Sequence, residues 1–117
     1  MSVKPSSKLI DTIIDAIDDV KGENITLLDL TEIENAICEY FIICSANSNT
    51  QVNAIASNVE KKVRNQISER PISVEGTDNA QWVLIDYGNV IVHVFQQQYR
   101  EYYDIEGMWS DAAMVTY

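Results

Sequence analysis

The chain of 117 residues carries a formal net charge of −10 and is 46% hydrophobic. This excludes a disordered chain and predicts one folded domain, 1–117, with a core over about residues 6–109 and a loose tail over 110–117. Eight Lys and Arg stand against 18 Asp and Glu, so we expect little direct nucleic-acid binding, because that affinity comes largely from cations that neutralise phosphates. No apolar run approaches the roughly 20 residues of a membrane helix, and no signal or transit peptide is recognisable, so we expect a cytoplasmic protein without membrane contact.

A first amphipathic helix is predicted between Ser7 and Val20, where apolar residues recur at three-to-four spacing. Ser6 or Ser7 is suited to cap its first turn, and Gly22 follows where the helix should end. The acidic residues of this helix lie away from its apolar stripe, which is most simply explained by a solvated surface.

Two short strands are expected next, over residues 25–30 and 40–45. The second is apolar along almost its whole length, which is typical of a central strand covered on both faces. Residues 31–39, with three glutamates between the strands, form either a bend or a helical turn. Cys38 and Cys44 have no partner at metal-ligand spacing, so we expect reduced, packed thiols.

A second helix is predicted over about residues 50–68, because Ser48 and Gln51 have the spacing of a capping box and an apolar stripe follows them. This helix is expected to be the crossover of a βαβ-like unit. Pro71 ends the helical pattern, and residues 72–76 are predicted to form a short strand.

A β-hairpin is predicted over residues 82–95, since two runs rich in β-branched and aromatic residues flank Asp86-Tyr87-Gly88-Asn89. With a loop of two or four residues, we expect Ile85 opposite Val90 and Trp82 opposite His93. Alternation then creates one aliphatic face that should be buried: Val83, Ile85, Val90, Val92 and Val94. The other face mixes polar groups with large rings and is the candidate binding face: Trp82, Leu84, Ile91, His93 and Phe95.

A last helix of about two turns is expected after Phe95, with four side chains available to pack: Tyr99, Tyr102, Tyr103 and Met108. The order of elements is then α, β, β, α, β, β, β, α. This order predicts an α/β fold in which helices pack on a mixed sheet of about five strands.

Catalytic and metal-binding patterns are sparse. His93 is the only histidine, which excludes a catalytic triad or a multi-histidine metal site, and a lone strand histidine is more often half-buried and hydrogen-bonded than a base. Glu75, Asp78 and Asp86 lie at turns, where acidic residues are expected for backbone reasons alone. Phosphate-binding and dinucleotide-binding glycine motifs are missing. We therefore expect no enzyme activity, no catalytic residue, no metal and no cofactor.

The order of elements also resembles that of nucleotidyltransferases, which hold metal ions between carboxylates on neighbouring strands. The turn over residues 45–48 lacks the glycine that grips a triphosphate, and Asp29-Leu30-Thr31 lacks the second acid. The alternative hypothesis is a degenerate, metal-dependent protein of this kind that uses Asp29, Glu75 and Asp86.

Aromatic and acidic residues are concentrated together near the C-terminal third: Trp82, Tyr87, Tyr102, Tyr103 and Trp109 with Glu75, Asp86, Glu101, Asp104 and Glu106. Trp and Tyr anchor protein interfaces, and acidic surfaces favour encounter with basic partners such as ribosomal proteins. Solubility alone would also explain the charge. The rings could instead complete the core under the last helix, which we expect of Tyr103 and Trp109 more than of Trp82.

An ordered set of motifs carries a family resemblance: Tyr40-Phe41-Ile42-Ile43-Cys44-Ser45, Glu75-Gly76, Trp82-Val83 with Asp86 and Gly88, His93-Val94-Phe95, Arg100 with Tyr102-Tyr103, and Glu106 with Trp109. In these residues the chain resembles the ribosomal silencing factor family, RsfS or iojap-like proteins, over about residues 6–112. It departs from the usual pattern at Ala46, where glycine is commoner, and at Gly107-Met108.

The resemblance implies a nucleotidyltransferase-like fold without its catalytic acids and a regulator that represses translation under nutrient limitation. Family members bind the large ribosomal subunit through its fourteenth ribosomal protein, a basic partner, and hinder association with the small subunit. By analogy, the partner-binding residues are expected to be Trp82, Leu84, Asp86, Ile91, His93, Tyr102 and Glu106. A homodimer through the exposed rings is a further possibility in isolation.

Overall fold

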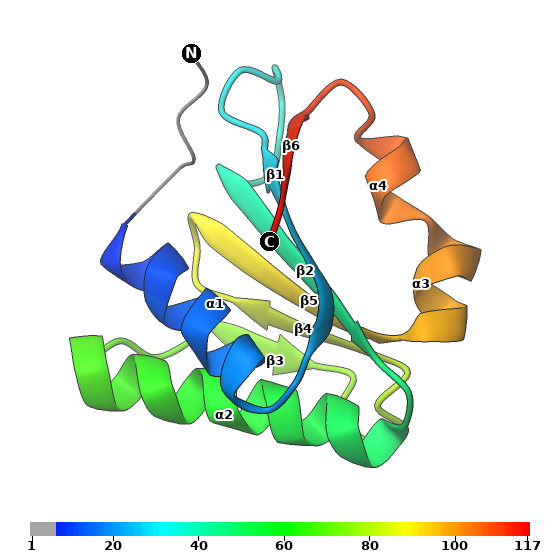
Figure 1. Ribbon diagram of the computed structural model, residues 1–117. Coiled ribbons are helices and arrows are strands. Elements are labelled where there is room, and N and C mark those ends of the chain that lie inside the picture. The colour runs from blue at the N-terminus through cyan, green and yellow to red at the C-terminus, as the bar shows by residue number, and fades with distance from the viewer. Residues whose placement is uncertain (1–6) are drawn as a thin grey trace.

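A six-stranded sheet with helices on both faces forms the protein in the computed structural model, which describes residues 7–117 (Figure 1). The helices are α1 (Lys8–Asp19), α2 (Asn49–Ile67), α3 (Gln97–Tyr103) and α4 (Ile105–Met108). The strands are β1 (Glu23–Asp29), β2 (Tyr40–Ala46), β3 (Ser73–Glu75), β4 (Trp82–Asp86), β5 (Val90–Gln96) and β6 (Ala113–Thr116). No helix among these residues is long and apolar enough to cross a bilayer.

The sheet is mixed, with strand order β3-β4-β5-β2-β1-β6. β2 and β5 are parallel, and every other neighbouring pair is antiparallel. α2 is the crossover that leads from β2 to the far edge of the sheet. The predicted α/β fold is therefore confirmed, and β2 is the central, buried strand that its continuous apolar sequence predicted.

The two helices α1 and α2 pack side by side on one face and close an aliphatic core (Figure 1). Both helices begin as their sequences predicted: Ser7 accepts a hydrogen bond from the amide of Ile10, and Ser48 from that of Gln51, each over 3.1 Å. Gln51 does not complete a capping box, because its side-chain oxygen accepts from the amide of Asn47 and not from that of Ser48. Its side-chain nitrogen donates to the carbonyls of Val20 and Lys21. It thus fastens the start of α2 to the end of α1.

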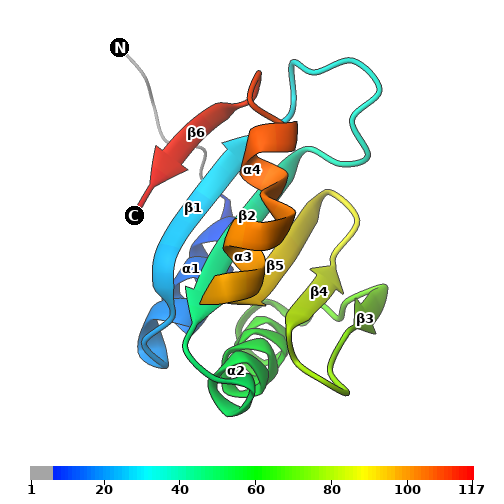
Figure 2. The same ribbon diagram turned by 90° about the vertical axis from the view of Figure 1, so that its right-hand side faces the viewer.

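The opposite face carries a second, smaller core under α3 and α4. Figure 2 shows these short helices in front of the middle of the sheet, with β3 and β4 beside them and not covered by a helix. Buried Phe41, Ile43 and Phe95 lie at its centre. Both cysteines are free, with Cys44 buried in the first core and Cys38 packed against the second. Burial raises the pKa of Cys44 to about 12.

The expected hairpin register is wrong by two residues. Trp82 lies opposite Phe95, and Leu84 opposite His93, because the turn is only Gly88-Asn89, closed by a 2.9 Å hydrogen bond from the amide of Tyr87 to the carbonyl of Val90. Tyr87 is buried and extends the hairpin instead of belonging to its loop. Since side chains alternate with a period of two, this shift leaves both predicted faces unchanged.

The C-terminal part differs more from expectation. Residues 110–117 are not a loose tail, since they contain β6, which pairs antiparallel with β1 as the sixth strand. The last helix is two helices, broken at Asp104, whose φ of 45° is left-handed and whose side chain caps α4. Tyr102 and Met108 are 79% and 74% exposed, so they do not pack as predicted. Residues 31–39 form bends and turns and no helix.

Candidate partner-binding surface

Trp82 is the centre of a row of aromatic rings that leads from the core to the solvent. Its indole stacks on the buried ring of Phe95, with ring centres 4.9 Å apart and planes at 25°. Tyr103 lies 4.9 Å from the indole, and Tyr102 meets Tyr103 edge-on at 5.1 Å. Tyr103 is 43% exposed and Trp82 half-buried. We call the side chains of Trp82, Leu84, Tyr102 and Tyr103 the Trp82 surface.

The alternation along β4 produces this surface. Val83 and Ile85 point into the core under α1 and α2, so Trp82 and Leu84 point to the other face, which no helix covers at this edge. Trp82 and Leu84 line a shallow hollow of about 260 Å³ together with Glu75 and Gly76. Gly76 has a φ of +91°, and a Cβ there would collide with the carbonyl oxygen of Trp82. A glycine is therefore required for the turn after β3 to lie against β4.

His93 lies under the Trp82 surface. It is 4% exposed, and its Nδ1 accepts a hydrogen bond of 3.1 Å from the indole N–H of Trp82. Its ring also meets Phe41 edge-on at 4.5 Å. Burial lowers the pKa of His93 to about 3, so the imidazole is neutral at physiological pH and Nδ1 is free of a proton. The hydrogen bond of the predicted strand histidine is confirmed, but its burial is more complete than predicted.

Arg100 anchors the helices of the second face to the sheet. The residue is 8% exposed, and its guanidinium donates to both carboxylate oxygens of Glu106 over 3.0 Å. The same group donates to the carbonyl of Asn24 over 2.7 Å and to the hydroxyl of Thr26 over 3.2 Å. Charge-assisted, bidentate hydrogen bonds of this kind are strong and directional. α3 and α4, and with them Tyr102 and Tyr103, are thereby held at a fixed position against β1.

Positive and negative charges are distributed unequally around the sheet. Six of the Lys and Arg residues in the described part lie on α1 and α2 or in the loops that follow them: Lys8, Lys21, Lys61, Lys62, Arg64 and Arg70. The other one is Arg100, which is buried and paired with Glu106. Apart from the buried Arg100, no Lys or Arg lies on β3, β4 or α3, which carry the acidic residues Glu75, Asp86 and Glu101. The side of the molecule that carries the Trp82 surface is acidic.

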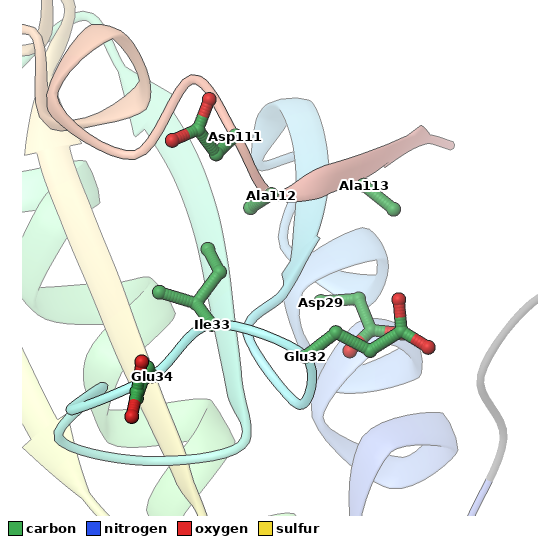
Figure 3. Close-up of a pocket in the computed structure, with 7 residues that line it drawn as sticks. All are labelled: Asp29, Glu32, Ile33, Glu34, Asp111, Ala112 and Ala113. Atoms are coloured by element: carbon green, nitrogen blue, oxygen red, sulfur yellow. The ribbon is translucent and has the colours of Figure 1, made fainter.

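A second hollow, of about 500 Å³, lies between the 31–34 loop and the start of β6 (Figure 3). Its lining includes Asp29, Glu32, Glu34 and Asp111. In Figure 3 the carboxylates of Glu34 and Asp111 stand apart from each other and from those of Asp29 and Glu32. Asp29 accepts hydrogen bonds from the amide and hydroxyl of Thr31. Across residues 7–117, no group of three or more acidic, histidine or cysteine side chains is placed to hold a metal ion.

The three acids of the nucleotidyltransferase hypothesis do not converge. Asp29 ends β1, whereas Glu75 and Asp86 lie on β3 and β4, and β5 and β2 separate these strands from β1. Asp86 is engaged by the amide of Gly88 over 2.7 Å, as its position in a turn predicted.

Known proteins resemble this chain over nearly its full length. The family model described as "Ribosomal silencing factor during starvation" matches residues 3–116. The ribosomal silencing factor RsfS of Bacillus subtilis is 43% identical over 102 residues, covering 85% of this chain and 82% of that protein. This chain belongs to the ribosomal silencing factor family. The predicted resemblance is confirmed.

Other relatives of this family member include a solved structure of similar fold and a protein with a ribosomal name. A crystal structure of a protein from Chromobacterium violaceum superposes with a TM-score of 0.82 at 34% identity, covering 94% of this chain and 88% of that one. A mouse protein, 27% identical over 74 residues that make up 62% of this chain and 32% of its own length, is named mitochondrial assembly of ribosomal large subunit protein 1.

The predicted site residues of this silencing-factor family member divide into three groups. Trp82, Leu84 and Tyr102 lie together on the Trp82 surface. Ile91 and His93 are buried beneath it, 6% and 4% exposed. The remaining two, Asp86 at the hairpin turn and Glu106 on α4, are half-buried and hydrogen-bonded within the chain. The seven residues therefore differ in accessibility, and only the first group forms a continuous exposed surface.

Sequence reasoning missed two contributors and misplaced one ring. Tyr103 was expected in the core, but it lies beside Trp82 and is 43% exposed. Trp109 packs edge-on against Phe41 in the second core, as expected. Gly76 and Arg100 were seen only as motif positions. A glycine directly after a strand is a detectable signal of a positive φ. The residues of β1 that Arg100 contacts lie 74 and 76 positions away in the sequence, so no local pattern indicates these contacts.

Proposed function

We propose that this protein binds the large ribosomal subunit in the cytoplasm through its Trp82 surface and blocks association with the small subunit, repressing translation under nutrient limitation. The partner is a basic ribosomal protein, which the family resemblance gives as the fourteenth of the large subunit. The mechanism is steric occlusion without catalysis. The observation that carries the proposal is the row of exposed rings around Trp82 on the acidic side of the sheet.

The rings have the properties of an interface anchor. Trp and Tyr dominate the binding energy of protein interfaces because they bury large apolar areas and keep a polar edge. Phe95 and Tyr103 already hold the indole of Trp82, so less side-chain entropy is lost when a partner covers it. Tyr102, 79% exposed, supplies further area that no other described part of the chain covers.

The charge distribution favours a basic partner over nucleic acid. The acidic residues flanking the rings, Glu75 and Glu101 among them, repel phosphates and attract Lys and Arg. Ribosomal proteins are rich in these cations because they hold RNA. Complementary charges steer the encounter and raise the association rate, while the rings supply the affinity.

Co-sedimentation with purified large subunits tests this proposal. Trp82→Ala should weaken binding by about 2 kcal/mol, or roughly thirtyfold, as expected for a central aromatic anchor. Tyr103→Ala should have a smaller effect in the same direction. The matched control is Tyr117→Ala, because Tyr117 is 43% exposed, as Tyr103 is. Tyr117 interacts electrostatically with Asp11 of α1 and so lies on the side of the sheet opposite to the Trp82 surface. Equal binding by the Trp82 and Tyr117 variants would contradict the assignment of the surface.

The two other readings make separate predictions. A degenerate nucleotidyltransferase would show a rise in melting temperature with magnesium and a nucleoside triphosphate, and we expect none. A homodimer through the Trp82 surface would appear in sedimentation velocity as a concentration-dependent species that Trp82→Ala abolishes. The dimer is compatible with the proposed function, whereas nucleotide binding would favour the other class.

A further inference from the structure

We propose that His93 is a positioning residue: its Nδ1 holds the indole of Trp82 in the orientation in which the Trp82 surface meets its partner. This inference rests on the proposed function for its consequence in binding, but its structural half can be measured on the isolated protein. His93 itself does not touch the partner, because it is 4% exposed and lies under the ring.

The geometry fixes the indole from three directions. The N–H of Trp82 donates to Nδ1 of His93 over 3.1 Å, its face stacks on Phe95, and Tyr103 lies against it. His93 comes from β5, one strand away, and stands opposite Leu84 in the ladder. Its own ring is immobilised edge-on by Phe41 at 4.5 Å and lies nearly parallel to Phe95. The acceptor therefore sits on a rigid support.

The protonation state matches this task. Burial lowers the pKa of His93 to about 3, so the imidazole stays neutral in the cell. Because Nδ1 accepts from the indole, the proton of the neutral ring is on Nε2. Burial is the one cause that acts on this pKa, and the rings of Phe41, Trp82 and Phe95 surround the imidazole. The acceptor is thus available at every physiological pH.

His93 has a buried N–H group without a hydrogen-bond partner in residues 7–117, which argues against a purely structural role. Nε2 is buried and has no hydrogen-bond partner among the described residues, and an unpaired buried N–H destabilises the folded state. A phenylalanine at this position would fill the same space between Phe41 and Phe95 without that cost. What phenylalanine cannot supply is an acceptor for the indole of Trp82. If His93 served only stability, His93→Phe should leave binding unchanged. If His93 positions Trp82, His93→Phe should keep stability and weaken binding.

Two variants separate these roles. His93→Phe keeps the ring and removes the acceptor. His93→Asn keeps an acceptor, because its Oδ1 lies about where Nδ1 was, and removes most of the ring. We expect His93→Phe to melt at the same or a higher temperature and to bind large subunits about three- to tenfold more weakly, the factor that one hydrogen bond provides. His93→Asn should melt lower but bind within about twofold of the parent protein.

The side-chain N–H resonance of Trp82 reports the orientation directly in a ¹H–¹⁵N spectrum, with the indole of Trp109 as internal reference. In His93→Phe this resonance should move upfield and exchange faster with water, while that of Trp109 stays in place. In His93→Asn both should remain near their parent positions. An unchanged Trp82 resonance in His93→Phe would overturn the proposal, as would weaker binding by His93→Asn than by His93→Phe. Should His93→Phe fail to fold, His93→Leu removes the acceptor with less volume and is read in the same way.

Failure of the proposed function looks different. If Trp82→Ala binds large subunits as tightly as the parent protein, the surface is misassigned, and the indole resonance still decides whether His93 orients Trp82. If Trp82→Ala loses binding while His93→Phe keeps it, the function stands and the positioning role of His93 is wrong.

Discussion

The two faces of the sheet are built from the same strands but differ in kind. The face under α1 and α2 is aliphatic and closed, with Ile42, Val92 and Ile55 all fully buried. The face under α3 and α4 is aromatic and only partly covered, because those helices have seven and four residues. β4, which carries Trp82 and Leu84, lies beside these two helices. The first face is a closed core, and the second leaves aromatic rings accessible, as the proposed partner-binding role requires.

A large-to-small substitution in the core of the closed face should have the largest effect on stability. Ile55→Ala, at a fully buried position of α2, should lower the free energy of unfolding by about 2–5 kcal/mol, because a cavity remains in the core. Denaturant unfolding measures this loss of free energy. The control Ile72→Ala, at 73% exposure, should change stability by less than about 0.5 kcal/mol. A comparable loss in both variants would remove the distinction between core and surface.

Removing the anchor of the second face should have the next largest effect. Arg100→Ala leaves Glu106 without its bidentate partner and frees α3 and α4 from β1, at a cost of about 3 kcal/mol. Thermal unfolding measures the loss. Glu106→Gln keeps a hydrogen-bond acceptor and should cost about 1 kcal/mol. If Arg100→Ala is as stable as Glu106→Gln, the guanidinium does not hold these helices.

Acid should destabilise the second face through His93. Its pKa is about 3 in the folded chain against 6.5 as its ordinary value, so below pH 6.5 the unfolded chain binds a proton that the folded chain does not. Stability from this group is present above pH 6.5 and falls by about 1.4 kcal/mol per pH unit towards pH 3. Comparing parent protein and His93→Phe at pH 7 and pH 5 isolates the effect. Equal acid sensitivity of the two would contradict it.

The smallest expected effect concerns charge. Neutralising Glu75 and Glu101 as E75Q and E101Q should slow association with large subunits about two- to fivefold at low ionic strength, and the difference should vanish near 1 M salt. The matched control neutralises Asp15 and Asp18, exposed on α1, as D15N and D18N. Stopped-flow mixing gives both rates. Equal slowing by the two pairs would mean that net charge, and not its distribution, steers the encounter.

Local patterns predicted what depends on neighbouring residues. The helix caps at Ser7 and Ser48, the central strand β2 and the alternation of the hairpin side chains were correct. On the candidate binding face, however, Ile91, His93 and Phe95 are buried, and only Trp82 and Leu84 are accessible. β6 was missed because four mostly exposed residues carry little periodicity, and they become a strand only by pairing with β1. The hairpin register failed because the burial of Tyr87, which shortens the turn, depends on packing that no local pattern encodes.

The candidate site divides in the same way. Trp82, Leu84 and Tyr102 were predicted from residue type and alternation. The hydrogen bond between Trp82 and His93 and the contact between Tyr103 and Trp82 join different elements, and such contacts depend on strand register and helix position that local patterns do not determine. The residues that present a surface can thus be recognised from sequence more readily than the residues that orient it.

The most direct test of the account is the joining of ribosomal subunits in the presence of this protein, measured by sucrose-gradient sedimentation. At saturating concentration the parent protein should reduce the joined fraction, Trp82→Ala should leave it nearly unaffected, and Tyr117→Ala should act like the parent. Unchanged joining at saturating parent protein would contradict the central claim.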